Sequence, residues 1–432
     1  MNFWRASVLV LLTGLAALAA AAVGFQVLGF SVSGFAWVVP LVAALLILLR
    51  YPGRVLFPWW IWVAWTLVLV LYLTQARAPH ALQRTIMMIS PVVVGMAAST
   101  ARVSSASALA TLRFLRVLAV ALFAAIAWNT GFLFTGVLPE YGAFAASVMT
   151  AALLATVFAA EYSFGRRSSL GWWGVMQLVP LIAFTRTGMI ASALTFPLCF
   201  GPIKVGKRVL SLALIGAGGL LIFSTPRMQT RMFYSGSGTI SEMSFDNPDF
   251  ATGGRSTLWP EFAQEIERKP WLGHGANASE RFARVLAEGV EHPHNDWLRL
   301  LYDYGYLGAA LFALTLLAQV FHAFLAGRGA QGLTKVFFVC AVSSFVVLSI
   351  FMLTDNIVLY AAFFGNLQFA LLGLAYGSVG RRKEGGRTPP APVSPPRGQA
   401  GAAPDHQFWD RLDRFRWRLA GDINDLKGGD SS

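Results

Sequence analysis

Long apolar segments, separated by short polar ones, run through most of this chain. Several approach twenty residues, which is enough for a helix to cross a hydrocarbon core of about 30 Å. Because each crossing must satisfy its own backbone hydrogen bonds, the pattern predicts helices rather than an open sheet. Roughly twelve spans are predicted on this criterion, at residues 8–29, 33–50, 55–73, 85–99, 115–134, 142–160, 170–185, 187–203, 208–224, 297–325, 333–353 and 356–379. The segment 85–99 is the least regular, because Ser90, Pro91 and Gly95 interrupt it.

One long polar segment divides this array. Residues 226–296 separate nine predicted spans in 1–225 from three in 297–380. The predicted fold class is therefore an all-α polytopic membrane protein with one large extramembrane loop containing short helices. The first apolar segment shows no convincing cleavage site, so it is predicted to be a retained helix rather than a removed signal peptide.

A short helix is predicted inside the polar segment. Ser256 or Thr257 carries a side chain suited to capping its start. Three apolar residues then recur at spacings of three and four, and so share one helical face: Trp259, Phe262 and Ile266. Arg255 lies just before this helix, where free backbone N–H groups favour an anion.

The C-terminal residues 381–432 form a separate unit of different composition. Residues 385–404 are rich in Pro, Gly and Ala, which predicts a disordered linker. Apolar residues at helical spacing follow, accompanied by several arginines: Phe408, Leu412, Phe415 and Leu419. This pattern indicates either an amphipathic helix on an anionic membrane surface or a solvated helix.

Charge is sparse and unevenly distributed. The chain is 56% hydrophobic and 13% charged, with a net charge of +13. The basic residues gather in alternate loops, so the positive-inside rule predicts cytoplasmic termini and a periplasmic loop at 226–296 in a bacterial inner membrane. That loop holds seven basic and ten acidic residues. The excess positive charge is therefore an orientation signal, and a nucleic-acid partner is not predicted.

Metal and thiol chemistry are not predicted. Cys199 and Cys340 lie within apolar segments, where cysteine is a small buried hydrophobe. His274, His292 and His294 lack the carboxylate or cysteine partners that would complete a convincing metal site. No cofactor is predicted.

Three residues stand out as candidates for chemistry. Arg186 lies at the external junction of two spans, where it either faces a functional cavity or extends to the interface. Arg255 is either an anion ligand or an ordinary loop arginine. His294 lies where the polar segment enters the next span, so it is either a proton-transfer group or a structural cap.

The combination of motifs resembles the O-antigen ligase and polymerase superfamily, which are bacterial membrane glycosyltransferases with a periplasmic His-Asn loop. The resemblance rests on Gly254-Arg255, Trp259, Pro270, Gly273-x-Gly275, His294-Asn295-Asp296 and Tyr304-Gly305-Tyr306-Leu307-Gly308. These motifs cover about residues 180–310. By analogy, Arg186, Arg255 and His294 match the family's essential arginines and histidine.

The resemblance implies an activity. A glycan would move from undecaprenyl diphosphate to an acceptor hydroxyl on lipid A-core, without a metal and with inversion. The arginines would bind the diphosphate, with Arg77, Arg84 and Asn295 as further candidate ligands, and His294 would be the general base. A polymerase or a protein O-oligosaccharyltransferase would share this design.

Two other classes remain open. A polysaccharide transporter or flippase would predict acidic residues in mid-membrane and internal repeats. Acidic residues within the predicted spans are few, and no convincing repeat is found. A non-catalytic assembly partner would not need Arg186, Arg255 and His294 to converge on one external cavity. Their convergence therefore discriminates among these classes.

Overall fold

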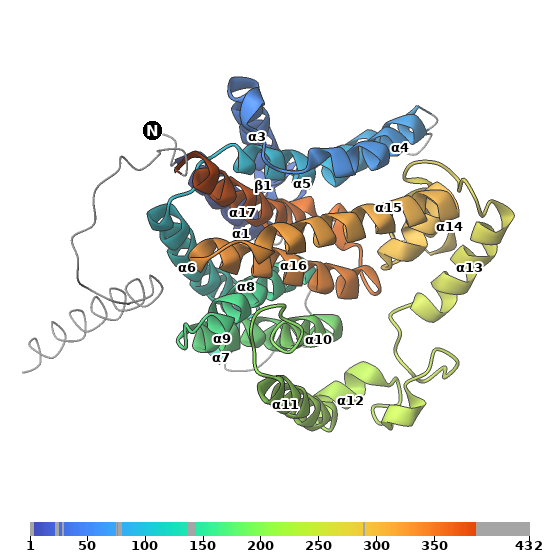
Figure 1. Ribbon diagram of the computed structural model, residues 1–432. Helices are drawn as coiled ribbons and strands as arrows, with labels where there is room; N and C mark the ends of the chain where they lie inside the picture. The colour runs from blue at the N-terminus through green and yellow to red at the C-terminus, as the bar shows by residue number, and fades with distance from the viewer. Residues whose placement is uncertain are drawn as a thin grey trace, which may run out of the picture. The chain divides into compact units, whose positions relative to one another are not determined.

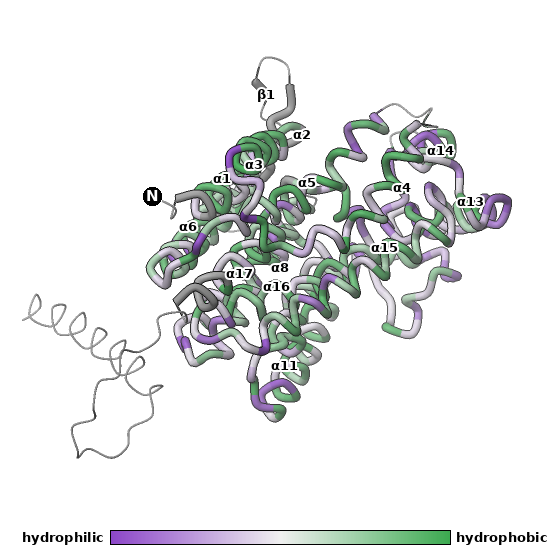
Figure 2. The backbone as a smooth tube through the Cα atoms, turned by 45° about the horizontal axis from the view of Figure 1, so that its top comes forward, coloured by the Kyte–Doolittle hydropathy of each residue, from purple (hydrophilic) through white to green (hydrophobic). Residues whose placement is uncertain are grey.

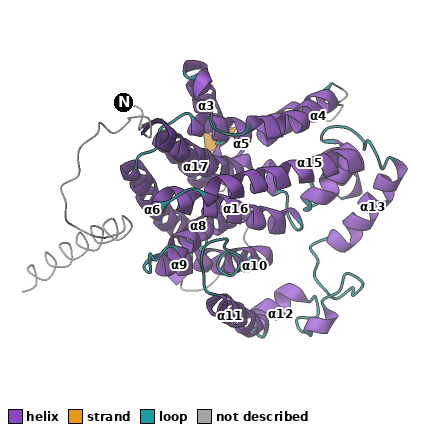
Figure 3. Ribbon diagram, viewed as in Figure 1, coloured by secondary structure: helices purple, strands orange, loops and turns teal. Residues whose placement is uncertain are grey.

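The described part of the protein is helical almost throughout (Figure 3). The computed structural model describes residues 4–21, 26–27, 30–74, 76, 80–135, 144–287 and 290–385. Within these residues, the one sheet is a pair of two-residue antiparallel strands, β1 (Gln26–Val27) and β2 (Phe30–Ser31). The predicted linker and amphipathic helix beyond residue 385 lie outside the described residues.

The α-helices follow the order of the predicted apolar segments (Figure 1). They are α1 (Trp4–Ala21), α2 (Val32–Phe35), α3 (Val38–Arg50), α4 (Val63–Leu73), α5 (Ala81–Ser99), α6 (Ser105–Asn129), α7 (Phe132–Thr135), α8 (Ala145–Ser163), α9 (Ser169–Ile182), α10 (Arg186–Leu194), α11 (Val205–Phe223), α12 (Pro226–Met232), α13 (Arg255–Arg268), α14 (Ala278–Leu286), α15 (Asp296–Arg328), α16 (Gly332–Met352) and α17 (Asn366–Gly385). The shorter helical turns are η1 (Pro52–Arg54), η2 (Trp59–Trp62), η3 (Ile240–Glu242), η4 (Ile357–Leu359) and η5 (Ala361–Gly365).

Among the described residues, six helices are long and apolar enough to cross a membrane: α5, α6, α8, α11, α15 and α16. Five shorter apolar helices accompany them, at Ser7–Ala19, Val38–Arg50, Trp59–Leu73, Ser169–Ile182 and Phe363–Val379. The all-helical class is therefore confirmed, with six helices that could cross a membrane, whereas the count of twelve spans and the periplasmic loop stay predictions. The predicted span 187–203 contains only the nine-residue α10, which is about 14 Å long at 1.5 Å per residue.

Hydrophobic residues follow the helices, and hydrophilic residues gather at helix ends and around α13 (Figure 2). Helix α8 is the most buried of the candidate spans and packs against α6, α9, α10 and α16. In contrast, α11 has no buried residue along its length. Its apolar face is therefore available to lipid or to a lipid-like ligand.

The residues that make segment 85–99 irregular are those that let α5 pack closely on α17. A Cβ added at Gly373 would lie 2.2 Å from the Gly95 carbonyl oxygen. The Ser90 hydroxyl donates a hydrogen bond to Asn366 Oδ1 at 2.9 Å. Helix α5 is nevertheless continuous, with Pro91 buried within it. Small and hydroxyl residues at close helix contacts are typical of membrane proteins.

A buried carboxylate ties three helices together at the basic end of the bundle. Glu161 at the end of α8 is 1% exposed. It accepts hydrogen bonds from Arg116 of α6 at 2.9 Å and from Ser169 of α9 at 2.9 Å, and it pairs with Arg166. A buried charge is tolerated when it is paired and hydrogen-bonded in this way.

Candidate functional site

A cavity of about 630 Å³ lies where the polar segment meets the bundle. Its walls come from the start of α10, from α12, from the chain preceding α13 and from the loop after α16. Three arginines line it, namely Arg186, Arg231 and Arg255. Among the described residues that line it, Asp355 is the only acidic one. The cavity therefore carries an excess of positive charge, which suits an anionic ligand.

Arg186 links the bundle to the polar segment. It is the first residue of α10, and its Nη2 donates to the Ala251 carbonyl oxygen at 2.9 Å. Its guanidinium also lies 5.9 Å from the centre of the Phe250 ring. Burial lowers the pKa of Arg186, and the positive charges of Arg255 and Arg231 lower it further. The cationic groups of this cavity therefore repel one another, and a bound anion would relieve that repulsion.

Arg255 enters the cavity from the other side. It begins α13 directly after Gly254, whose φ of +81° is accessible to glycine. The predicted cap at Ser256 or Thr257 is therefore wrong, because the helix begins before those residues. The Arg255 guanidinium donates to the carbonyl oxygens of Thr252 at 3.0 Å and Thr354 at 2.9 Å, and its buried Nε has no hydrogen-bond partner among the described residues. Burial lowers its pKa, and Asp355 acts in the opposite direction.

His294 lies beside the cavity and faces a carboxylate. Its Nδ1 is 3.5 Å from Asp355 Oδ1, and its side chain is 45% exposed. Its φ is +52°, a conformation uncommon outside glycine. An imidazole held at Nδ1 by a carboxylate presents Nε2 as a proton acceptor. The geometry therefore suits general-base chemistry at an accessible position.

The loop carrying His294 is fixed on both sides. Trp259 of α13 donates a hydrogen bond from its indole to the Pro293 carbonyl oxygen at 2.7 Å. Asn295 caps α15 by accepting from Leu298 N at 3.0 Å, and it also lines the cavity. The backbone N–H of Asp296 donates to the Asp355 carbonyl oxygen at 3.2 Å. The segment before α15 and the loop after α16 are thus joined at the position of His294.

Asp355 is a site residue that the sequence motifs do not single out. It lies in the loop after α16, between His294 and Arg255. Its carboxylate also accepts a hydrogen bond from Asn356 N at 2.8 Å, which fixes its orientation. The available signal was a polar Asp-Asn pair between two apolar segments.

The remaining candidates are placed differently. Arg77 lies outside the described residues. Arg84 does not line the cavity but forms a 3.6 Å ion pair with the buried Glu280 and lies 3.3 Å from His292 Nε2. Its contact with a diphosphate stays a prediction. Within the described part of the chain, no three His, Cys, Asp or Glu side chains gather as a metal site requires.

The contact between Arg84 and the buried His292 predicts that folding stability depends on pH. Burial, and then the charge of Arg84, lowers the pKa of His292 from 6.5 to about 2. As the pH falls below 6.5, the unfolded chain takes up a proton that the folded protein does not, so stability falls. Between pH 7 and 5 we expect the wild type to lose about 2 kcal/mol that His292→Gln retains. The slope of thermal midpoint against pH measures this, and parallel slopes for the two proteins would contradict it.

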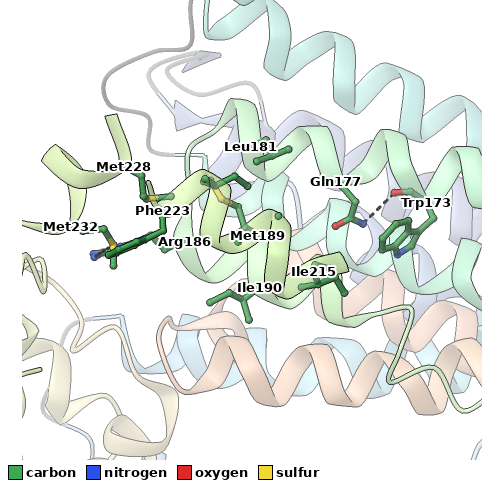
Figure 4. Close-up of a pocket in the computed structure, with 14 residues that line it drawn as sticks. Trp173, Gln177, Leu181, Arg186, Met189, Ile190, Ile215, Phe223, Met228 and Met232 are labelled. Carbon is green, nitrogen blue, oxygen red and sulfur yellow. Dashed lines mark hydrogen bonds between the residues drawn. The ribbon is translucent and has the colours of Figure 1, made fainter. Parts of the chain in front are cut away.

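An apolar groove of about 380 Å³ continues from the cavity. It runs between α9, α10 and α11, and shares Arg186, Ile190 and Met232 with the cavity. Arg186, Met228 and Met232 lie at one end, and Trp173 and Gln177 lie at the other (Figure 4). A charged cavity therefore leads directly into an apolar groove, which is an arrangement suited to an amphipathic ligand.

Comparison with known proteins agrees with this arrangement. Residues 172–313 match the family model described as O-antigen ligase. The matched region begins in α9 and ends near the middle of α15, so it contains Arg186, Arg255 and His294. Asp355 lies outside it. No curated protein matches the chain. Over residues 172–313, the protein is therefore similar to the O-antigen ligase family.

Proposed function

We propose that this protein transfers a glycan from undecaprenyl diphosphate to an acceptor hydroxyl of lipid A-core at the periplasmic face of the inner membrane. One observation carries this proposal: Arg186 and Arg255 line one cavity, and the His294–Asp355 pair lies at its border. A non-catalytic assembly partner would not require this convergence. The family match supports a function of the O-antigen ligase or polymerase type.

The chemistry follows from the charges. The arginines bind the diphosphate and neutralise the charge that develops as the anomeric carbon–oxygen bond breaks. The acceptor hydroxyl oxygen forms the new bond to the anomeric carbon on the opposite face, which inverts the configuration. His294 Nε2 takes up the hydroxyl proton, and the bond electrons leave with the diphosphate. Asp355 keeps the imidazole oriented. The guanidinium groups supply positive charge that metal ions supply in other transferases.

The apolar groove suits the polyprenyl chain of the donor. The groove between α9, α10 and α11 is apolar and begins at Arg186. A diphosphate held by the arginines would direct its lipid tail into this groove. With the basic loops in the cytoplasm, residues 226–296 face the periplasm, where the donor is presented.

The test is a lipopolysaccharide profile of a deletion strain carrying variants of the gene. Arg255→Ala is expected to leave the core unsubstituted and to accumulate lipid-linked polymer. Arg268→Ala is the control, because it removes an arginine from the exposed end of the same helix. Single capped repeats would assign the protein as a polymerase, and a loss confined to glycoproteins would assign it as a protein O-oligosaccharyltransferase. Normal lipopolysaccharide together with unchanged glycoproteins in Arg255→Ala would refute all three.

A further inference from the structure

A second cavity lies at the other end of α15, far from the candidate active site. It has a volume of about 480 Å³ and lies where α15 turns into α16, against residues 200–202. Helix α15 contains 33 residues, begins beside His294 and ends at Arg328. The part of α15 that follows its break at Gly305 is alone about 35 Å long at 1.5 Å per residue, so the two cavities lie far apart. Figure 1 shows the two ends of α15 on opposite sides of the bundle.

The walls of this second cavity are apolar and its rim is basic. Phe200, Phe324 and Phe338 provide aromatic surface. Phe200 is 52% exposed and Phe324 is 39% exposed. Arg328 and Lys335 are the charged residues among the described lining residues, and none of these is acidic. A ligand with apolar chains and an anionic group matches this surface.

Arg328 and Lys335 differ from their basic neighbours in what they contact. Arg116 and Arg166 pair with Glu161. Arg208 donates hydrogen bonds to the carbonyl oxygens of Pro197 and Gly201.

In contrast, the Arg328 guanidinium lies 4.8 Å from the centre of the Phe324 ring. Lys335 Nζ donates to the Arg328 carbonyl oxygen at 3.2 Å. Among the described residues, neither of these two cations pairs with a carboxylate, so both are available to an external anion.

We propose that this cavity binds an anionic phospholipid. Its phosphate would lie between Arg328 and Lys335, and its acyl chains would lie against Phe200, Phe324 and Phe338. Basic pockets between membrane helices on the cytoplasmic side bind lipid head groups in this way. A free phosphate would use the two cations but would leave the aromatic walls unoccupied. The site goes beyond the transferase reaction, because its residues are separate from those of the candidate active site.

The test is lipid binding to the full-length protein in neutral detergent, followed by native mass spectrometry. The probes are phosphatidylglycerol, phosphatidylcholine and inorganic phosphate. We expect preferential binding of phosphatidylglycerol. The double variant R328Q/K335Q is expected to weaken it about thirty-fold, since each basic residue near a membrane surface contributes about a factor of five. The conservative double variant R328K/K335R is expected to bind nearly as the wild type does.

The matched control removes one arginine and one lysine that do not line this cavity. R167Q/K204Q changes exposed residues and should leave phosphatidylglycerol binding unchanged. An equal loss of phosphatidylglycerol binding in R328Q/K335Q and in R167Q/K204Q would show attraction to net charge alone and would overturn the proposal. So would full binding by R328Q/K335Q, or displacement of the lipid by inorganic phosphate at equal concentration. Because this experiment measures lipid binding and not glycan transfer, its outcome is independent of the proposed function.

Discussion

Replacing His294 with alanine is expected to reduce glycan transfer by about 10²–10⁴-fold, the usual contribution of a positioned general base. The reason is the geometry at the cavity border, where His294 is accessible and its Nδ1 lies 3.5 Å from Asp355. The measurement is the initial rate of transfer from a purified lipid-linked donor to a core acceptor. Donor affinity should change little, because the diphosphate is assigned to the arginines.

Asp355→Asn tests whether the carboxylate acts through the histidine. We expect a lower kcat with a nearly unchanged KM for the donor. The loss should be smaller than the roughly 10⁴-fold seen when a buried triad aspartate becomes asparagine, because this pair is partly exposed. Asp246→Asn is the control, since Asp246 is an exposed acid in the same polar segment. A rise in KM without a change in kcat would assign Asp355 to donor binding through Arg255 instead.

The helices and the main site residues follow from local patterns. Apolar length predicted segments that coincide with α5, α8, α15 and α16, because a lipid environment requires self-contained backbone hydrogen bonding. The motif around Arg255 and His294 was sufficient to identify them as candidates. Both line or border one cavity with Arg186.

The features that local patterns do not predict depend on contacts between residues that are far apart in the sequence. Asp355 meets His294 across 61 positions, so no spacing rule connects them. Arg84 has the charge of a phosphate ligand, but it is engaged by Glu280 and His292, which come from the polar segment. The early start of α13 depends on the left-handed conformation of Gly254, which a search for Ser or Thr caps overlooks.

The break in α15 also depends on contacts between residues that are distant in the sequence. These contacts join two segments that each contain a glycine motif. Gly305 has φ +66° and ψ −173°, which is not helical. Around this break, Tyr306 N donates to the Pro270 carbonyl oxygen at 2.7 Å, and His274 N donates to the Tyr302 carbonyl oxygen at 2.9 Å. The loop at 270–275 therefore satisfies the backbone groups that the broken helix exposes, as irregular backbone near a membrane requires.

Gly305→Ala is expected to destabilise the protein by about 4 kcal/mol or more, because strained backbone and steric overlap add. A Cβ at this position would lie 2.4 Å from the Trp271 carbonyl carbon and oxygen. Moving the loop away would break the hydrogen bonds that close the gap in α15. The thermal midpoint of the purified protein in detergent measures the effect.

Gly216→Ala is the matched control for this prediction. Gly216 lies within α11, and a Cβ there would meet nothing within 4 Å. This change should stabilise the helix by roughly 0.5–1 kcal/mol, since alanine restricts the unfolded chain. Equal midpoints for the two variants would show that the loop and the helix do not depend on each other. If Gly305→Ala selectively lowers the thermal midpoint, we also expect it to slow glycan transfer. The reason is that α15 begins at the His294 loop, and its start is held between α13 and the loop after α16.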